Sequence, residues 1–188
     1  MIRRPVQRVG PSFARCLSTT LALTSQHAQF LSLVSGHGGG EVKLGFFGPE
    51  SSSKTKVAEI TLNNPAKRNA VTGRMMKDLA EVVDYLTLSV DMKQSDCVAI
   101  VLRSAGDEVF SSGADLGLAT TLLNSPDNGL LMSQFMTNAL NRLRSSGYIS
   151  VCGITGSALG GGAELITTTD FRIMSSAKNH FIQFIHAK

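Results

Sequence analysis

Residues 156–165 read Gly-Ser-Ala-Leu-Gly-Gly-Gly-Ala-Glu-Leu, and the apolar run Tyr-Ile-Ser-Val-Cys-Gly-Ile at residues 148–154 comes just before them. The apolar run predicts a buried strand, and residues 163–169, after the glycines, predict a short helix. Consecutive glycines at 160–162 expose backbone N–H groups and let a ligand come close, and the helix start adds the positive end of its dipole. The segment lacks both the P-loop and the dinucleotide-binding patterns, so it predicts a site for an anionic oxygen of another kind.

A second glycine turn follows a second apolar run. Residues 97–102 (Cys-Val-Ala-Ile-Val-Leu) predict a strand buried on both faces, and residues 110–116 (Phe-Ser-Ser-Gly-Ala-Asp-Leu) come shortly after it. Alternation of strands with helices predicts an α/β fold with crossover connections. The other expected elements are strands at 57–62, 171–174 and 181–185, and amphipathic helices at 75–88, with Thr72 as its N-cap, and at 127–143.

The positive charge of the chain is confined to its beginning. Of 18 Lys and Arg residues, four (Arg3, Arg4, Arg8 and Arg15) lie in residues 1–40, which contain no Asp or Glu; the remaining 14 balance 14 acidic residues. A neutral body gives no electrostatic footprint for nucleic acid, and no apolar run reaches the roughly 18 residues that a membrane span needs. The composition of residues 1–40 is typical of a mitochondrial targeting peptide or of a disordered extension. We therefore predict an extension at 1–40 and a single domain at 41–188.

Cysteine and histidine spacing predicts no metal site. The three cysteines, Cys16, Cys97 and Cys152, lie far apart in the sequence, and the four histidines are scattered. No pair has the spacing of a zinc site, and an odd number of distant cysteines does not indicate a disulfide scaffold.

Three blocks together resemble the enoyl-CoA hydratase/isomerase (crotonase) superfamily. They are residues 62–70 (Leu-Asn-Asn-Pro-Ala-Lys-Arg-Asn-Ala), residues 110–116, and residues 156–165 with Asp170, Phe171 and Arg172. The order and spacing of the blocks carry the resemblance, which covers about residues 57–188. It implies a ClpP/crotonase-like spiral of repeated ββα units and a small-molecule acyl-CoA substrate. It implies no cofactor, neither biotin nor a metal, and no membrane or nucleic-acid partner.

The resemblance also implies an oxyanion hole for the thioester oxygen. Its two donors would be the backbone N–H groups of Ser112 and Gly161, which would stabilise a thioester enolate. Lys67 and Arg68 would lie near the CoA phosphates, although solvated surface charges are the alternative for both. The residues expected to bind the acyl-CoA are Ser112, Gly113, Ala114, Asp115, Gly161, Lys67 and Arg68.

The expected acid and base residues favour decarboxylation over hydration. Hydratases use two glutamates, and Glu164 matches the first of them. At the second position stands Phe184 or, with a two-residue insertion in the preceding loop, His186. Decarboxylation needs the oxyanion hole, an apolar pocket and a proton donor, for which Glu164 and His186 are the candidates. The blocks and the closing residues 184–188 resemble the acyl-CoA decarboxylases of the superfamily; a hydratase or isomerase and an inactive form are the alternatives.

The resemblance further implies that family members continue beyond residue 188 with helices that cover the acyl pocket and form trimer contacts. We therefore expect a C-terminally truncated form with an exposed apolar patch and little or no activity. A family-type homotrimer or hexamer would lack part of its contacts. The resemblance implies a cytosolic protein, whereas the Arg-rich N-terminus indicates the mitochondrial matrix as the alternative.

Overall fold

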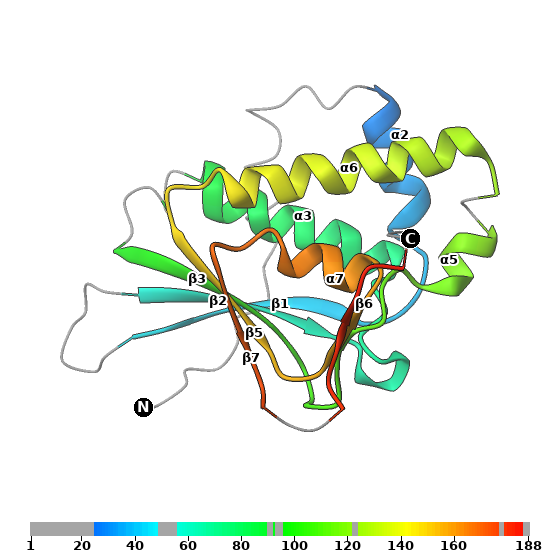
Figure 1. Cartoon of the computed structure of the whole chain (residues 1–188). Helices are drawn as coiled ribbons and strands as arrows, with labels where there is room; N and C mark the ends of the chain where they lie inside the picture. The colour runs from blue at the N-terminus through cyan, green and yellow to red at the C-terminus, as the bar shows by residue number, and fades with distance from the viewer. Residues whose placement is uncertain are drawn as a thin grey trace.

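Two sheets contain the strands of the computed structural model, which describes residues 25–48, 56–89, 92, 96–121, 124–176 and 179–185. The larger sheet has the order β1-β2-β3-β5-β7, in which β1 and β2 are antiparallel and the other neighbours are parallel (Figure 1). The smaller sheet has the order β4-β6-β8 and is parallel throughout. The strands of the larger sheet are β1 (Glu41–Phe47), β2 (Lys56–Asn63), β3 (Cys97–Ser104), β5 (Ile149–Ile154) and β7 (Phe171–Met174). Those of the smaller sheet are β4 (Val109–Ser111), β6 (Ser157–Leu159) and β8 (Ile182–Gln183).

From β3 onward, consecutive strands alternate between the two sheets. In each of the pairs β3–β4, β5–β6 and β7–β8, the first strand belongs to the larger sheet and the second to the smaller one. Helices α5 (Leu116–Thr121) and α6 (Pro126–Arg144) follow β4, and α7 (Gly161–Ile166) follows β6. This repetition confirms the predicted α/β spiral of ββα units.

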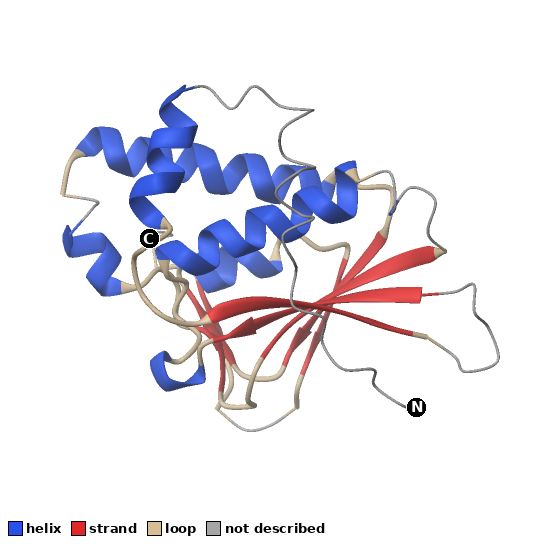
Figure 2. Ribbon diagram, turned by 180° about the vertical axis from the view of Figure 1, so that it is seen from behind, coloured by secondary structure: helices blue, strands red, loops and turns tan. Residues whose placement is uncertain are grey.

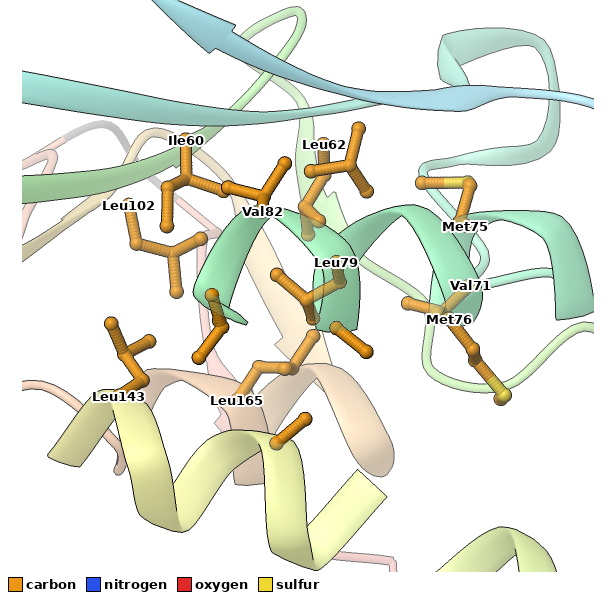
Figure 3. Packing of buried hydrophobic residues seen from close by; sticks show 14 of the residues in the cluster. Ile60, Leu62, Val71, Met75, Met76, Leu79, Val82, Leu102, Leu143 and Leu165 are labelled. Atoms are coloured by element: carbon orange, nitrogen blue, oxygen red, sulfur yellow. The ribbon is translucent and has the colours of Figure 1, made fainter. Parts of the chain in front are cut away.

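The central helix of the core is α3 (Gly73–Leu88), as the apolar spacing predicts. Thr72 caps it, because its hydroxyl accepts a hydrogen bond from Met75 N at 3.2 Å. Burying one large aliphatic side chain contributes roughly 1.5–3 kcal/mol, so this face of α3 is a main source of stability. Figure 3 shows its side chains between the sheet residues Ile60, Leu62 and Leu102 and the helix residues Leu143 and Leu165. The buried apolar residues of α3 are Met75, Met76, Leu79, Ala80, Val82, Val83 and Leu86.

Helices α2 (Ser25–Val34), α3, α5, α6 and α7 lie on one side of the larger sheet, apart from the short 3-10 helix at Pro65–Lys67 (Figures 1 and 2). Burial along β3 therefore alternates: Ile100 and Leu102 are buried, whereas Val98 is 52% exposed. On β5, Ile149 is 59% exposed. The prediction that residues 97–102 are buried on both faces is wrong, because the helices cover only one face.

A helix before the predicted domain boundary belongs to the core. Helix α2 (Ser25–Val34) contacts α3 and α6 and buries Phe30 and Val34. The ring centroid of Phe30 lies 5.9 Å from that of Phe135 on α6. The boundary predicted between residues 40 and 41 therefore does not match the structure. The predicted targeting or disordered segment falls largely on residues 1–24, which lie outside the described residues.

The expected apolar patch is found at the end of the spiral and is confirmed. We call it the β7–β8 margin, and its side chains are between 37% and 67% exposed. Its strands β7 and β8 lie at one edge of the larger and of the smaller sheet, respectively. Its residues are Phe171, Ile173, Met174, Phe181, Ile182, Phe184 and Ile185.

Neither a membrane helix nor a metal cluster occurs in the part of the chain that the structure describes. No helix there is long and apolar enough to cross a membrane, and no three His, Cys, Asp or Glu residues lie together as metal ligands. Cys97 and Cys152 are buried, and neither forms a disulfide with another described residue. Burial raises the pKa of the Cys152 thiol to about 12, so this thiol is not a nucleophile at neutral pH.

Candidate functional site

The two glycine turns predicted from the sequence lie against each other. Parallel pairing of β4 with β6 brings residues 111–115, here called the donor turn, beside residues 157–163, here called the glycine turn. A methyl group at Gly162 would lie 2.5 Å from the carbonyl oxygen of Ser111, and one at Gly113 would lie 3.0 Å from that of Leu159. Gly113 also has a φ of +92°, which side chains disfavour. Glycine at both positions is therefore what lets the turns meet.

One backbone amide of the donor turn has no hydrogen-bond acceptor. Ser112 N donates to the carbonyl of Arg68 at 3.1 Å, and Asp115 N donates to that of Val71 at 3.0 Å. Gly113 N donates to the hydroxyl of Ser111 at 3.2 Å. Among the described residues, Ala114 N–H alone in residues 112–115 has no acceptor. The amide of Ser112, expected as an oxyanion donor, is thus committed to Arg68, and the amide of Ala114 is available instead.

The facing amide on the glycine turn is that of Gly161. Gly160 N donates to the carbonyl of Gln183 at 2.9 Å, but Gly161 begins α7 and has no partner within that helix. Nor does Gly161 N–H have an acceptor elsewhere among the described residues. A methyl group at Gly161 would lie 3.7 Å from Ala114 N, so the two available amides are neighbours.

Two adjacent, unpaired amides can bind a single oxygen that carries negative charge. Both are held by structure that exists without the ligand: one in a turn tied to residues 68–71, the other at a helix start. Donors that are already in place when charge develops stabilise a transition state more than donors that must first reorient. The arrangement can therefore bind an oxygen that carries negative charge without a change in the two turns.

Glu164 lies beside this amide pair along the chain. It is in the first turn of α7, where its N–H donates to the carbonyl of Gly160 at 3.0 Å. Its side chain is exposed, and it forms no ion pair with any described residue. The structure thus places an acidic residue in the same helical turn as Gly161.

Lys67 and Asp115 form an ion pair next to the donor turn. Lys67 Nζ lies 3.0 Å from Asp115 Oδ2, and Asp115 Oδ1 accepts a hydrogen bond from Leu118 N at 3.2 Å. Burial of Asp115 opposes its ionisation, but the hydrogen bonds from Lys67, Leu118 and Gly117 and the charge of Lys67 outweigh burial and lower its pKa. Asp115 therefore anchors the start of α5. Arg68 is exposed and has a left-handed φ of +51°.

The last strand reaches the glycine turn. A methyl group at Gly160 would lie 3.4 Å from Ile185 Cδ1, and Ala158 N donates to the carbonyl of Phe181 at 2.9 Å. Phe184, one candidate for the second acid position, is 43% exposed. The other candidate, His186, lies outside the described residues.

The sequence predicted Ala114 among the residues that bind the acyl-CoA, but not that its amide is the unpaired one; nor did it predict the buried pair Asn69 and Ser111 behind the donor turn. A backbone N–H leaves no mark in the sequence, because every residue except proline has one. Only the hydrogen-bond pattern of the folded turn reveals which amide is free. The one available signal was the position of Asn69 in the block 62–70, between a proline turn and a helix.

Comparison with known proteins identifies related families and folds. The profile of the enoyl-CoA hydratase/isomerase family matches residues 52–186. The ethylmalonyl-CoA decarboxylase of Xenopus laevis is 40% identical over 136 residues, which cover 72% of this chain and 42% of the relative. That of Danio rerio is 40% identical over 149 residues, or 79% of this chain and 45% of the relative. The chain thus spans less than half the length of these curated relatives.

Solved structures support the fold. An enoyl-CoA hydratase/carnithine racemase from Magnetospirillum magneticum superposes with a TM-score of 0.61 at 26% identity, covering 73% of this chain and 47% of the other. An enoyl-CoA hydratase from Bacillus anthracis gives a TM-score of 0.59 at 21% identity, covering 71% and 46%. The second similarity is informative about the fold alone.

Proposed function

The chain belongs to the enoyl-CoA hydratase/isomerase family, and from that premise we propose that it binds an acyl-CoA thioester at the two glycine turns. The thioester oxygen accepts hydrogen bonds from Ala114 N–H and Gly161 N–H. The observation that carries this proposal is that these neighbouring amides are the ones left unpaired where the turns meet. Lys67 and Arg68, on the segment that holds the donor turn, supply positive charge for the CoA phosphates.

The reaction that we propose is decarboxylation of ethylmalonyl-CoA to butyryl-CoA and CO2, with methylmalonyl-CoA as a weaker substrate. The bond between C2 and the carboxylate breaks, and its electron pair moves into the thioester to form an enolate. The two amides stabilise the enolate oxygen, and a proton donor, Glu164 or His186, then protonates C2. The thioester itself accepts the electron pair, so the step calls for no cofactor. Such an enzyme would remove a wrongly carboxylated metabolite, a metabolite-repair role.

Two observations support decarboxylation over hydration. The curated relatives at 40% identity carry the name ethylmalonyl-CoA decarboxylase. The position of the second hydratase glutamate is taken by Phe184 or His186, neither of which is a carboxylate. Glu164 alone can serve a decarboxylase, because a single protonation completes that reaction.

The test is to incubate the purified protein with ethylmalonyl-CoA and to follow CO2 and butyryl-CoA. We expect equal amounts of both, formed slowly, because the exposed β7–β8 margin lets water reach the donors and weakens their hydrogen bonds. A parallel incubation with crotonyl-CoA measures hydration. Hydration without CO2 release would show a hydratase, and binding of butyryl-CoA without turnover of either substrate would show an inactive form.

We also propose a cytosolic location, as the family resemblance implies. The alternative is the mitochondrial matrix, because of the arginines in residues 1–40. A fluorescent reporter fused to residues 1–40 distinguishes the two. Mitochondrial fluorescence that disappears when Arg3, Arg4, Arg8 and Arg15 are replaced by glutamine would contradict the cytosolic proposal.

A further inference from the structure

A buried polar cluster joins the donor turn to two other segments. Asn69 is 1% exposed and Ser111 is fully buried. Asn69 Nδ2 donates to the carbonyls of Ala105 at 2.8 Å and Val109 at 2.9 Å, at the two ends of the connection between β3 and β4. Asn69 Oδ1 accepts a hydrogen bond from Asn64 N at 2.9 Å. Both N–H groups of this side chain are therefore used.

The backbone of Asn69 holds the donor turn directly. Its carbonyl accepts a hydrogen bond from Ser111 Oγ at 2.8 Å, and the same hydroxyl accepts one from Gly113 N at 3.2 Å. Asn69 has a left-handed φ of +52°, a conformation that asparagine tolerates better than most residues. The side chain thus secures a backbone shape from which the carbonyl of Asn69 reaches Ser111.

The hydrogen bonds around Ala114 show that the position of its amide depends on the segment that contains Asn69. Val71 N donates to the carbonyl of Gly113 at 2.8 Å, and Asp115 N donates to the carbonyl of Val71 at 3.0 Å. The amide of Ala114 therefore has no acceptor of its own, but the residues on both sides of it are tied to the segment that Asn69 secures. A shift of that segment moves the amide relative to Gly161.

We infer that Asn69 is a positioning residue that sets the distance between the Ala114 and Gly161 amides. The inference rests on the proposed function, since it concerns the oxyanion hole described there. Asn69 acts through Ser111 and the donor turn. Donor groups must lie within about 0.5 Å of their productive position, so a small displacement of the turn is enough to weaken the site.

The chemistry of the cluster requires asparagine at this position. Aspartate has the same shape, but its carboxylate has no N–H to donate. It would face the carbonyl oxygens of Ala105 and Val109 without a hydrogen bond to either. Glycine tolerates the left-handed backbone without strain but removes both donors and leaves the two carbonyls without them. Asn69→Gly therefore removes the side-chain hydrogen bonds of Asn69 while its left-handed backbone conformation stays accessible.

Asn179→Gly is the matched control. Asn179 also has a left-handed φ, of +72°, but its side chain is exposed, and it lies between β7 and β8.

The probe is butyryl-CoA labelled with ¹³C at the thioester carbonyl, whose stretching frequency falls when the oxygen accepts hydrogen bonds. Isotope-edited infrared spectra of the bound probe report the oxyanion hole, and the affinity for CoA without an acyl group reports the rest of the binding site.

We expect a lowered carbonyl frequency in the wild-type protein and in Asn179→Gly. In Asn69→Gly, about half of that shift or more should disappear, because one of two donors is displaced, while the affinity for CoA stays at the wild-type value. The corresponding loss in kcat is up to about 10²–10³-fold, with little change in KM.

A folded Asn69→Gly protein with the wild-type carbonyl shift would overturn the inference. Absence of a shift in the wild-type protein would instead overturn the proposed oxyanion hole, and the inference with it. If Asn69→Gly does not fold, Ser111→Ala decides, because it removes only the hydroxyl between Asn69 and Gly113. A reduced shift in Ser111→Ala supports the inference, and an unchanged shift overturns it.

Discussion

The donor turn and the β7–β8 margin both contact the glycine turn, but they are built in opposite ways. Backbone hydrogen bonds and buried polar side chains hold the donor turn, and Ser111 has no exposed surface. The margin presents apolar side chains to solvent, with Ile173 67% exposed and Phe184 43% exposed. The polar groups of the donor turn are therefore mostly hydrogen-bonded within the described residues. The apolar side chains of the margin are not buried by them.

This difference separates two parts of the proposed chemistry. The donor turn and Gly161 already hold the groups that would stabilise an enolate oxygen, because their positions depend on backbone packing within the described residues. The apolar residues of the margin, in contrast, are exposed in the part of the chain that the structure describes. Changes in the turns should therefore affect rate and folding, whereas changes in the margin should affect solubility.

The largest expected effect is that of Gly161→Pro on turnover. Proline is well tolerated at the first position of a helix, where Gly161 lies, but it has no N–H to donate. Loss of one oxyanion donor costs about 2.7–4 kcal/mol of transition-state stabilisation, or about 10²–10³ in kcat. The measurement is CO2 release from ethylmalonyl-CoA, with circular dichroism to confirm the fold. Unchanged kcat in a folded variant would exclude Gly161 as a donor.

The next effect is a difference in protein stability between alanine substitutions at two neighbouring glycines, Gly162 and Gly161. A methyl group at Gly162 would lie 2.5 Å from Ser111 O and 2.8 Å from Ser111 Cβ, whereas one at Gly161 makes contacts of 3.7 Å and longer. Forcing a methyl group into such a packed contact costs about 1–3 kcal/mol, so Gly162→Ala should lower the free energy of unfolding by that amount. Gly161→Ala should change it by less than about 0.5 kcal/mol. Urea unfolding of both variants is the measurement, and equal stabilities would contradict the close contact of the turns.

The sequence predicts the regular elements and the place where the two turns meet, but not which backbone amides are unpaired there. Apolar periodicity predicted β2, α3 and α6, because those elements bury one regular face. The short apolar run at residues 171–174 predicted β7, although its side chains are exposed. The glycine blocks predicted where the site lies, since Gly113 and Gly162 have no room for a side chain. The amide of Ala114 could not be predicted, because all backbone amides look alike until their acceptors are known. Helix α2 was missed because the absence of acidic residues before Glu41 placed the domain boundary after it. Strand β1 begins at Glu41, inside the predicted domain, and was also missed.

The ion pair beside the donor turn should give a smaller, pH-dependent effect. The folded pKa of Asp115 lies below its ordinary value of 3.8, so its ionised form stabilises the fold above that pH. This stability is lost as the pH falls below 3.8 through the folded pKa. Lys67 is 56% exposed, so the pair contributes only about 0.2–1 kcal/mol.

Lys67→Gln should therefore lower the free energy of unfolding at pH 7, and the difference from the wild-type protein should shrink below pH 3.8. The measurement is urea unfolding at a series of pH values. Lys43→Gln is the control, because Lys43 pairs with the half-buried Glu41, far from the donor turn in sequence. A difference that stays constant through the acidic range would show that Lys67 stabilises the fold by something other than its charge on Asp115.

The smallest effect on stability is expected at the β7–β8 margin. Phe171 is 60% exposed and Ile173 is 67% exposed, so replacing each by serine removes little buried apolar surface. We expect the double variant Phe171→Ser/Ile173→Ser to change the free energy of unfolding by no more than about 0.5 kcal/mol per site. Its solubility should rise, because exposed apolar side chains at a sheet edge promote association. Light scattering over a concentration series measures association, with Val98→Ser, at a 52% exposed position on β3, as the control. A clear loss of stability in the double variant would show that the margin is packed in solution, and the contrast with the donor turn would then be smaller than the structure indicates.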